Sequence, residues 1–344
     1  MKKKVVIGLS GGVDSSVALH LLQEKGYECI GVTMKVWDET ETEDAKALAE
    51  KFGINYRIVD FREKFKDKVQ DYFVNEYLSG RTPNPCTVCN RYVKLEALFS
   101  VADEVGADYV ATGHYARIVR LDNGRYTLMK TPTANKEQTY ALFRLSQEQL
   151  ERVLMPVGEY TKDEIRNIAR EMGMEVADKP DSQEICFIPD NDYAGFIGRY
   201  TGKTSVPGNF VDMGGKVLGR HNGIIHYTVG QRKGLNLSLG RPAFVVEIKP
   251  ETNEVVIGTN EDVFSDTLYA GDINYMGLDK IPEGGITAIG KIRYAHAGAV
   301  CKVTAETDGR IKVVFDEPQR AITPGQAIVL YDGDKVLLGG TILK

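Results

Sequence analysis

The strongest constraint on the fold is a strand–loop–helix pattern at the beginning of the chain. An apolar strand over residues 5–8 runs into a turn rich in serine and glycine, and a helix is expected from about Ser15 to Gly26. The N-terminus of a helix carries unpaired backbone N–H groups and the positive end of the helix dipole, so it binds phosphate well. The pattern predicts an α/β domain with a phosphate site after its first strand.

The residues of this loop exclude the two commoner phosphate-binding motifs. No lysine follows the last glycine, as the Walker A motif requires, and the spacing does not fit G-x-G-x-x-G. The segment instead resembles the PP-loop of ATP pyrophosphatases, which cleave ATP between the α and β phosphates and adenylate a substrate oxygen. A glycine-rich turn without a ligand is the alternative. The resemblance implies an ATP site, with Asp14 orienting Mg²⁺ or the loop, that is formed by Gly8, Leu9, Ser10, Gly11, Gly12, Val13, Asp14 and Ser15.

Strands and helices alternate along the first third of the chain. Strands are expected at residues 29–36, 55–59 and 109–111, and helices at 43–52, 61–77 and 93–105. Such alternation is typical of a doubly wound α/β fold with a parallel sheet, in which ligands bind beyond the carboxyl ends of the strands. Gly113 and His114 directly follow the strand at 109–111, so we expect them near the phosphate loop.

Beyond residue 115 the pattern becomes rich in β-structure. A hairpin is expected over residues 116–130, and Thr161 and Glu164 form a capping box for a helix that ends near Met172. After residue 204 glycine and proline separate short β segments. We expect a PP-loop catalytic domain over residues 1–203, a β-rich central domain over 204–278 and a C-terminal β-barrel over 279–344.

The bulk composition limits location and partners. The formal net charge is −5, so binding to nucleic acid would need a local basic patch. The chain contains no apolar run long enough to span a bilayer, and polar residues interrupt the short apolar run near the start, so we expect no membrane association and a cytoplasmic location. Five cysteines in 344 residues do not form a disulfide scaffold.

Three of the five cysteines lie in distinctive segments. Cys86 and Cys89 follow two prolines in Thr82-Pro83-Asn84-Pro85, which are expected to fix an extended loop that presents the thiols instead of burying them. Cys186 lies in the segment D-S-Q-E-I-C-F-I at 181–188. Cys29 and Cys301 lie in apolar strands, where core packing is the expected role.

These segments occur together with A-T-G-H at 111–114, K-E-Q-T-Y at 136–140 and H-Y-T-V-G-Q-R-K-G at 226–234. The set looks like the tRNA-specific 2-thiouridylases (MnmA/TrmU family) over essentially the whole chain. The resemblance implies ATP-dependent adenylation of the C2 oxygen of the wobble uridine, followed by sulfur transfer that gives 2-thiouridine, AMP and pyrophosphate. It also implies tRNAs for Lys, Glu and Gln as substrates, and a cysteine desulfurase or a sulfur-relay protein as donor.

The same resemblance assigns roles to individual residues. Cys186 carries the persulfide, and Cys89 is the nucleophile that resolves it as a disulfide; this chemistry requires thiols with a lowered pKa. Met34 and Gly113 line the adenine and ribose pocket. The resemblance places on tRNA the residues Asn84, Pro85, Cys86, His114, Lys136, Glu137, Gln138, Arg293, Tyr294 and Gln326.

Cys86 departs from the family pattern, which usually has aspartate at this position. Cys86, Cys89 and Cys186 together form a set of three thiolates that could hold a [4Fe–4S] cluster with one open iron, whereas zinc would lack a fourth ligand. The sequence leaves the cluster route and the two-cysteine persulfide route open. Other open functions are a different PP-loop adenylating ligase, a tRNA thiolase for another base, and a non-catalytic RNA-binding protein.

Overall fold

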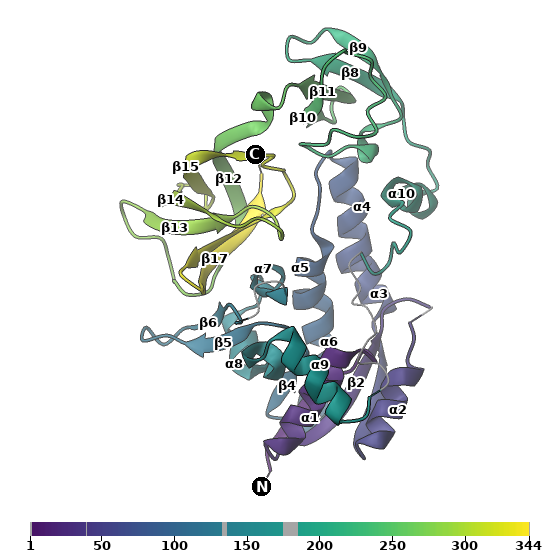
Figure 1. The fold of residues 1–344 in the computed structure, drawn as a ribbon, viewed down its shortest axis with the longest axis vertical. Helices are drawn as coiled ribbons and strands as arrows, with labels where there is room; N and C mark the ends of the chain where they lie inside the picture. The colour runs from purple at the N-terminus through teal and green to yellow at the C-terminus, as the bar shows by residue number, and fades with distance from the viewer. Residues whose placement is uncertain (1, 39, 133–135, 175–184, 344) are drawn as a thin grey trace.

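The computed structural model describes residues 2–38, 40–132, 136–174 and 185–343. An α/β domain forms one end of the molecule, a small β-sheet domain forms the other, and a β-barrel lies beside them (Figure 1). Helix α4 (Asp71–Leu78) extends from the α/β domain toward the central β-sheet domain. The predicted order of an α/β domain, a β-rich domain and a barrel is confirmed.

The sheet of the α/β domain is parallel and doubly wound, as predicted. Its strand order is β3-β2-β1-β4-β7, so the winding direction reverses between β1 and β4. Crevices at such a switch point, beyond the carboxyl ends of the strands, are where ligands bind in this class of fold. The strands are β1 (Lys4–Gly8), β2 (Glu28–Lys35), β3 (Asn55–Asp60), β4 (Tyr109–Ala111) and β7 (Val153–Leu154).

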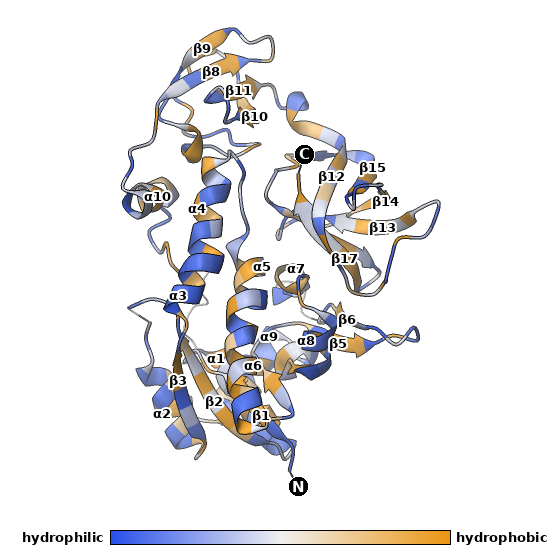
Figure 2. Ribbon diagram, turned by 180° about the vertical axis from the view of Figure 1, so that it is seen from behind, coloured by the Kyte–Doolittle hydropathy of each residue, from blue (hydrophilic) through white to orange (hydrophobic). Residues whose placement is uncertain are grey.

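Helices cover both faces of this sheet because its strands are apolar on both sides. Val5 and Ile7 of β1 belong to the same core cluster as Val17 of α1 (Val13–Glu24). Val6, which points to the opposite face, shares a core cluster with Leu98 of α6 (Leu95–Val105). Hydrophobic residues accordingly colour much of β1 and β2 orange in Figure 2. The helices α2 (Glu43–Lys51) and α9 (Lys162–Glu171) complete the α1 side.

Two helices of this domain contain π turns. The predicted helix at 61–77 is confirmed, as α3 (Arg62–Phe65), a π turn (Lys66–Gln70) and α4 in succession. The second begins with α5 (Pro85–Cys89) and continues through a π turn (Asn90–Lys94) into α6. The extended backbone predicted at the prolines is present up to Asn84, and Cys86 is exposed as predicted, but both cysteines lie on a helix and Cys89 is buried. Pro85 begins the helix, because the first helical position needs no N–H and favours the fixed φ of proline.

The predicted hairpin and capping box are both present. The hairpin consists of β5 (Arg117–Arg120) and β6 (Tyr126–Met129). The Glu164 backbone N–H donates to the Thr161 hydroxyl at 3.3 Å, which starts α9. Further helices of the described residues are α7 (Thr139–Leu142), α8 (Gln147–Arg152) and α10 (Tyr193–Thr201).

The remaining strands form two sheets. The central sheet has the order β10-β11-β8-β9 and comprises β8 (Gly208–Asp212), β9 (Val217–His221), β10 (Phe244–Lys249) and β11 (Glu254–Gly258). The barrel closes because β12 pairs with both β15 and β17, and β6 extends its sheet. Its strands are β12 (Phe264–Tyr275), β13 (Ile286–Lys291), β14 (Ala299–Ala305), β15 (Ile311–Arg320), β16 (Ala327–Asp332) and β17 (Lys335–Ile342).

The sequence placed the start of the barrel domain at residue 279. Strand β12 precedes this residue, yet it pairs with the barrel strands β15 and β17. The boundaries after residues 203 and 278 stay predictions. Within the described parts of the chain, no helix combines the length and apolarity needed to cross a membrane.

Candidate active site

The phosphate loop lies between β1 and α1 and leaves the first helical turn open. Gly12 is the N-cap residue and has no side chain that could cap the N–H groups of that turn. Gly11 has a φ of +72°, and a Cβ there would lie 2.7 Å from the Cβ of Asp44. The Ser15 hydroxyl donates to the Gly12 carbonyl at 3.0 Å. Glycine is thus required by the backbone, and the geometry fits a phosphate group at the helix N-terminus.

Residues from two other strands flank this loop at the switch point. A Cβ on Gly113 would lie 2.8 Å from the backbone of Asp14 and Ser15, so the end of β4 touches the start of α1. The methyl carbon of Met34 would lie 3.8 Å from a Cβ on Gly8. The structure therefore brings the predicted nucleotide-binding residues together.

Asp14 is tied to the protein by two groups that sequence reasoning missed. The Lys162 ammonium donates to both of its carboxylate oxygens, at 2.7 and 2.9 Å, and the Tyr115 hydroxyl donates at 2.7 Å. These contacts connect α1 to α9 and to the segment after β4, which favours the loop-orienting role of Asp14. Lys162 lies between the two residues of the capping box, but that motif predicts only the start of a helix and gives no sign of the contact with Asp14.

The three cysteines predicted to act together differ in solvent exposure. Cys86 is exposed on the first turn of α5, whereas Cys89, one turn later, is buried in a cluster with Phe65 and Val93. Cys186 is exposed, and its neighbour Phe187 packs edge-on against Phe65 with ring centroids 5.5 Å apart. Phe187 therefore anchors Cys186 beside the cluster that contains Cys89. Residues 175–184, which include the first part of the predicted D-S-Q-E segment, lie outside the described residues.

The electrostatics of these thiols differ from the prediction. Burial raises the pKa of Cys89 to about 12, and burial also raises the pKa of Cys186. The positive charge of Lys94 opposes the shift at both thiols without reversing it. The expectation of lowered pKa values is wrong for the free protein, because apolar surroundings penalise a thiolate more than one cation stabilises it.

The three cysteines do not fit the iron–sulfur cluster. No three His, Cys, Asp or Glu side chains among the described residues, which include all five cysteines, are grouped as a metal site requires. Cys89 is buried among apolar side chains while Cys86 and Cys186 are exposed residues, and Lys94 brings a positive charge to the same place. The cluster on Cys86, Cys89 and Cys186 is therefore not supported.

His114 connects the nucleotide side of the site to the cysteine side. Its Nδ1 shares a 2.9 Å hydrogen bond with the Thr112 hydroxyl. Burial, assisted by the charge of Lys94, lowers the pKa of His114 to about 3, so the imidazole is neutral at physiological pH. His114 follows Gly113 directly, and the charge of Lys94 acts both on His114 and on the thiols of Cys89 and Cys186.

Several residues predicted to contact RNA form hydrogen bonds within the protein at the edge of the site. The Gln326 amide donates to the carbonyls of Thr82 and Pro83 at 2.8 and 3.3 Å, so the barrel holds the segment that leads into α5. Gln138 accepts from the Tyr115 backbone N–H at 2.8 Å. The buried Glu137 accepts from the backbone N–H of Thr139.

The other predicted RNA contacts vary in exposure. Tyr294 is 46% exposed, with its ring edge-on to Tyr140, and Arg293 donates to the Arg320 carbonyl at 3.1 Å. Asn84 is the N-cap residue of α5, and Pro85 behind it is buried. Lys136 is half-buried. Only some of these side chains therefore present polar or aromatic surface to an incoming RNA.

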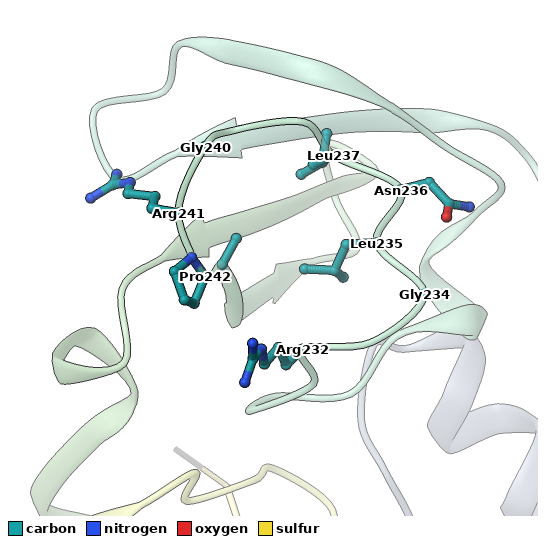
Figure 3. Close-up of a pocket in the computed structure, with 9 residues that line it drawn as sticks. Arg232, Gly234, Leu235, Asn236, Leu237, Gly240, Arg241 and Pro242 are labelled. Carbon is teal, nitrogen blue, oxygen red and sulfur yellow. The ribbon is translucent and has the colours of Figure 1, made fainter.

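A separate pocket lies in the central domain. It has a volume of about 470 Å³ and is formed by the loop from Arg232 to Ala243, with Arg232 and Arg241 at its rim (Figure 3). The described residues that line it include none of the predicted site residues. We therefore place the candidate active site at the switch point and not in this pocket.

Thiol exposure predicts an order of alkylation. At pH 7.5 we expect iodoacetamide to label Cys86 first and Cys186 next, while Cys29, Cys89 and Cys301 stay at least ~10-fold slower in the folded protein. Burial removes access and also raises the pKa of Cys29 to about 11 and of Cys301 to about 12. Mass spectrometry of peptides after timed labelling measures each rate, and the unfolded protein, with equal rates, is the control. Fast labelling of native Cys89 would contradict its burial.

The switch-point loop and the adjoining thiols together define a PP-loop nucleotide-binding domain equipped with a cysteine pair. Three family models match in succession: a tRNA methyl transferase HUP domain (residues 3–190), a tRNA methyl transferase PRC-barrel domain (194–259) and an aminomethyltransferase beta-barrel domain (265–342).

Full-length relatives point to one family. The tRNA-specific 2-thiouridylase MnmA of Lachnoclostridium phytofermentans is 57% identical, over 99% of this chain and 100% of its own length. The enzymes of the same name from Clostridioides difficile and Carboxydothermus hydrogenoformans are 50% and 51% identical, each over 100% of this chain and over 99% and 98% of their own lengths. The chain belongs to the tRNA-specific 2-thiouridylase family.

Proposed function

We propose that this protein converts a uridine of tRNA to 2-thiouridine, with ATP, bound as its Mg²⁺ complex, as the activating substrate. The observation that carries the proposal is that the phosphate loop and the cysteines are connected through a short chain of residues. The loop at Ser10–Ser15 touches Gly113, which precedes His114. The charge of Lys94 acts on both His114 and Cys89. A phosphate site and a pair of thiols in one place supply both activation and sulfur transfer.

In the first step the uracil C2 oxygen attacks the α-phosphorus of ATP. The bond between the α-phosphorus and the bridging oxygen breaks, and pyrophosphate leaves. The backbone N–H groups of the first turn of α1 stabilise the negative charge of the phosphates, and the Asp14–Lys162 pair holds that turn in place. The uracil then carries AMP on its C2 oxygen, which is a good leaving group.

In the second step Cys186, loaded as a persulfide, transfers its outer sulfur. That sulfur attacks C2, the C2–O bond breaks, and AMP leaves with the former uracil oxygen. The base is then joined to Cys186 through two sulfurs. The Cys89 thiolate attacks the Cys186 sulfur, which releases 2-thiouridine and forms a Cys89–Cys186 disulfide. A thiol reductant must reduce this disulfide before the next turnover.

Sulfur transfer explains the site better than methyl transfer, which the names of two family models mention. Methyl transfer needs a methyl donor and neither cleavage of ATP at the α-phosphorus nor a sulfur carrier. The phosphate loop beside α1 and the anchoring of Cys186 next to Cys89 would then have no use. The names of the full-length relatives refer to thiolation.

The finer assignments also belong to this proposal. We propose the wobble uridine of the tRNAs for Lys, Glu and Gln as the target, a cysteine desulfurase or sulfur-relay protein as the donor, and the cytoplasm as the location. Met34 and Gly113 would contact the nucleoside of ATP. The proposed tRNA contacts remain those named from the sequence, with the exposed ring of Tyr294 stacking on a base.

Cys86 distinguishes the persulfide route from the cluster route. Because the thiols do not converge on a metal site, we expect Cys86→Asp to retain at least about a third of wild-type thiolation when a persulfide donor is supplied. Cys86→Ala is the matched control for loss of the thiol alone. Iron and sulfide analysis of anaerobically prepared protein accompanies the assay. Iron bound to the wild-type protein, together with loss of thiolation in Cys86→Asp, would support the cluster route and contradict this prediction.

Analysis of the nucleotide products tests the proposed function. With tRNA and ATP labelled at the α-phosphate, the protein is expected to release labelled AMP and one pyrophosphate per AMP, and to release neither when tRNA is omitted. Release of ADP and orthophosphate would contradict a PP-loop mechanism. ATP binding without any tRNA-dependent cleavage would favour the non-catalytic alternative.

A further inference from the structure

We propose that Lys94 is the positioning residue for the sulfur step: its ammonium group is the fixed counter-charge for the sulfur anions that form on Cys186 and Cys89. The inference rests on the proposed function and deepens it, because it separates the residue that serves sulfur transfer from those that serve ATP cleavage.

The first support is the helix geometry. Cys89 is the last residue of α5, and Lys94 is the last residue of the π turn Asn90–Lys94 that follows. In a regular α-helix, residues five apart point about 140° away from each other. A π turn closes i→i+5 hydrogen bonds, as the Leu95 N–H does to the Asn90 carbonyl, and this brings residues five apart toward the same face. The irregular turn thus directs Lys94 to the side of Cys89.

The second support is the convergence of the cysteine segments on this turn. Val93, next to Lys94, is fully buried in the cluster that holds Cys89, and Phe187 packs against the same cluster. The aromatic contacts of Phe187 with Phe65 and Phe73, both with centroids 5.5 Å apart, fix the position of Cys186. Lys94 therefore interacts electrostatically with the thiols of both segments.

The third support is the charge balance around Lys94. Across the described parts of the chain no carboxylate forms an ion pair with Lys94, whereas Lys64 pairs with Glu96 on the surface close by. Burial acts to lower the pKa of Lys94, but its electrostatic interactions with the three cysteines outweigh this effect, and the pKa lies above its usual value. His114 is neutral and offers no negative charge. Among the described residues, the groups that act on this ammonium as anions are the sulfurs of Cys89, Cys86 and Cys186.

The chemistry needs such a charge at two moments. Negative charge lies on the outer sulfur of Cys186 before it attacks C2, and on Cys89 before it attacks the disulfide bond to the base. Both thiols lie in surroundings that disfavour anions, so each step requires a nearby cation. One preorganised cation serves both, because the two sulfurs must meet to form a disulfide.

The test compares two half-reactions in Lys94→Met and Lys94→Arg. Pyrophosphate release reports adenylation, and 2-thiouridine formation from preloaded Cys186 persulfide reports sulfur transfer, each in a single turnover. We expect Lys94→Met to keep pyrophosphate release within about threefold of wild type and to lose ~100-fold in sulfur transfer. Lys94→Arg, which keeps the charge, should recover at least a tenth of the wild-type rate. Lys68→Met, in the other π turn, is the control, because Lys68 forms an ion pair with the adjacent Asp67 at the surface.

Equal losses in both half-reactions, or an unchanged rate of sulfur transfer in Lys94→Met, would overturn the inference. If Lys94→Met does not fold, Lys94→Gln replaces it, with the same two rates measured and the same losses expected. The proposed function fails in a different way: wild-type protein would then release no pyrophosphate with tRNA and form no 2-thiouridine.

Discussion

Cys89→Ser and Cys186→Ser are each expected to reduce 2-thiouridine formation by at least ~1000-fold, because a serine hydroxyl can neither carry a persulfide nor act as the sulfur nucleophile. The two variants should differ in what accumulates. Cys186→Ser cannot be loaded with sulfur, whereas Cys89→Ser should be loaded and stop with the base joined to Cys186. Digestion of the tRNA and mass spectrometry of nucleosides and peptides measure both results.

The matched controls are the two cysteines that pack in the core. Cys29 and Cys301 are buried in apolar clusters, so Cys29→Ala and Cys301→Ala remove only a small hydrophobic side chain. We expect thiolation within about twofold of wild type and a stability loss of about 1 kcal/mol. Full activity in either the Cys89 or the Cys186 serine variant would remove that cysteine from the sulfur path.

Asp14→Asn is expected to abolish turnover at the earlier step. The substitution keeps the size of the side chain but removes the negative charge that holds Lys162. The Lys162 ammonium lies 2.7 Å from the Asp14 carboxylate, and its side chain is only 10% exposed. The first turn of α1 then loses its ionic link to α9, and pyrophosphate release should fall by at least ~100-fold. Because Lys162 loses its charge pair with Asp14 at a largely buried site, the free energy of unfolding should also fall, by about 3 kcal/mol.

Lys162→Met provides the comparison that isolates this pair. If the two residues act as a unit, the double variant should lose no more activity than the more impaired of the two single variants. Calorimetry and circular dichroism should show a folded protein in each case. Pyrophosphate release at wild-type rates from Asp14→Asn would contradict the role given to this ion pair.

The sequence predicts those elements whose geometry depends on residues that are adjacent along the chain. The phosphate loop can be predicted because Gly11 and Gly12 are required by the backbone itself, and the doubly wound sheet because apolar strands alternate with helices. The start of α1 lies only two residues before the predicted one, at Val13 instead of Ser15. The capping box at Thr161 is also confirmed.

Features that depend on tertiary contacts cannot be predicted in the same way. The prolines favour an extended loop at Pro85, but the same residue suits the first position of a helix, and only packing of Cys89 against Phe65 distinguishes the two. A π turn has no sequence signature, so nothing local indicates the role of Lys94. The partners of Asp14 lie 101 and 148 residues away along the chain. Burial likewise reverses the expected direction of the cysteine pKa shifts.

The most direct measurement of the central claim is the fate of a labelled sulfur atom. Protein loaded with a ³⁴S persulfide on Cys186 is mixed with unmodified tRNA and ATP, and nucleosides and nucleotides are quantified after one turnover. The account predicts one ³⁴S-labelled 2-thiouridine for each AMP and each pyrophosphate released, with a Cys89–Cys186 disulfide left on the protein. A methylated uridine, unlabelled 2-thiouridine, or ATP cleavage without sulfur in the tRNA would contradict it.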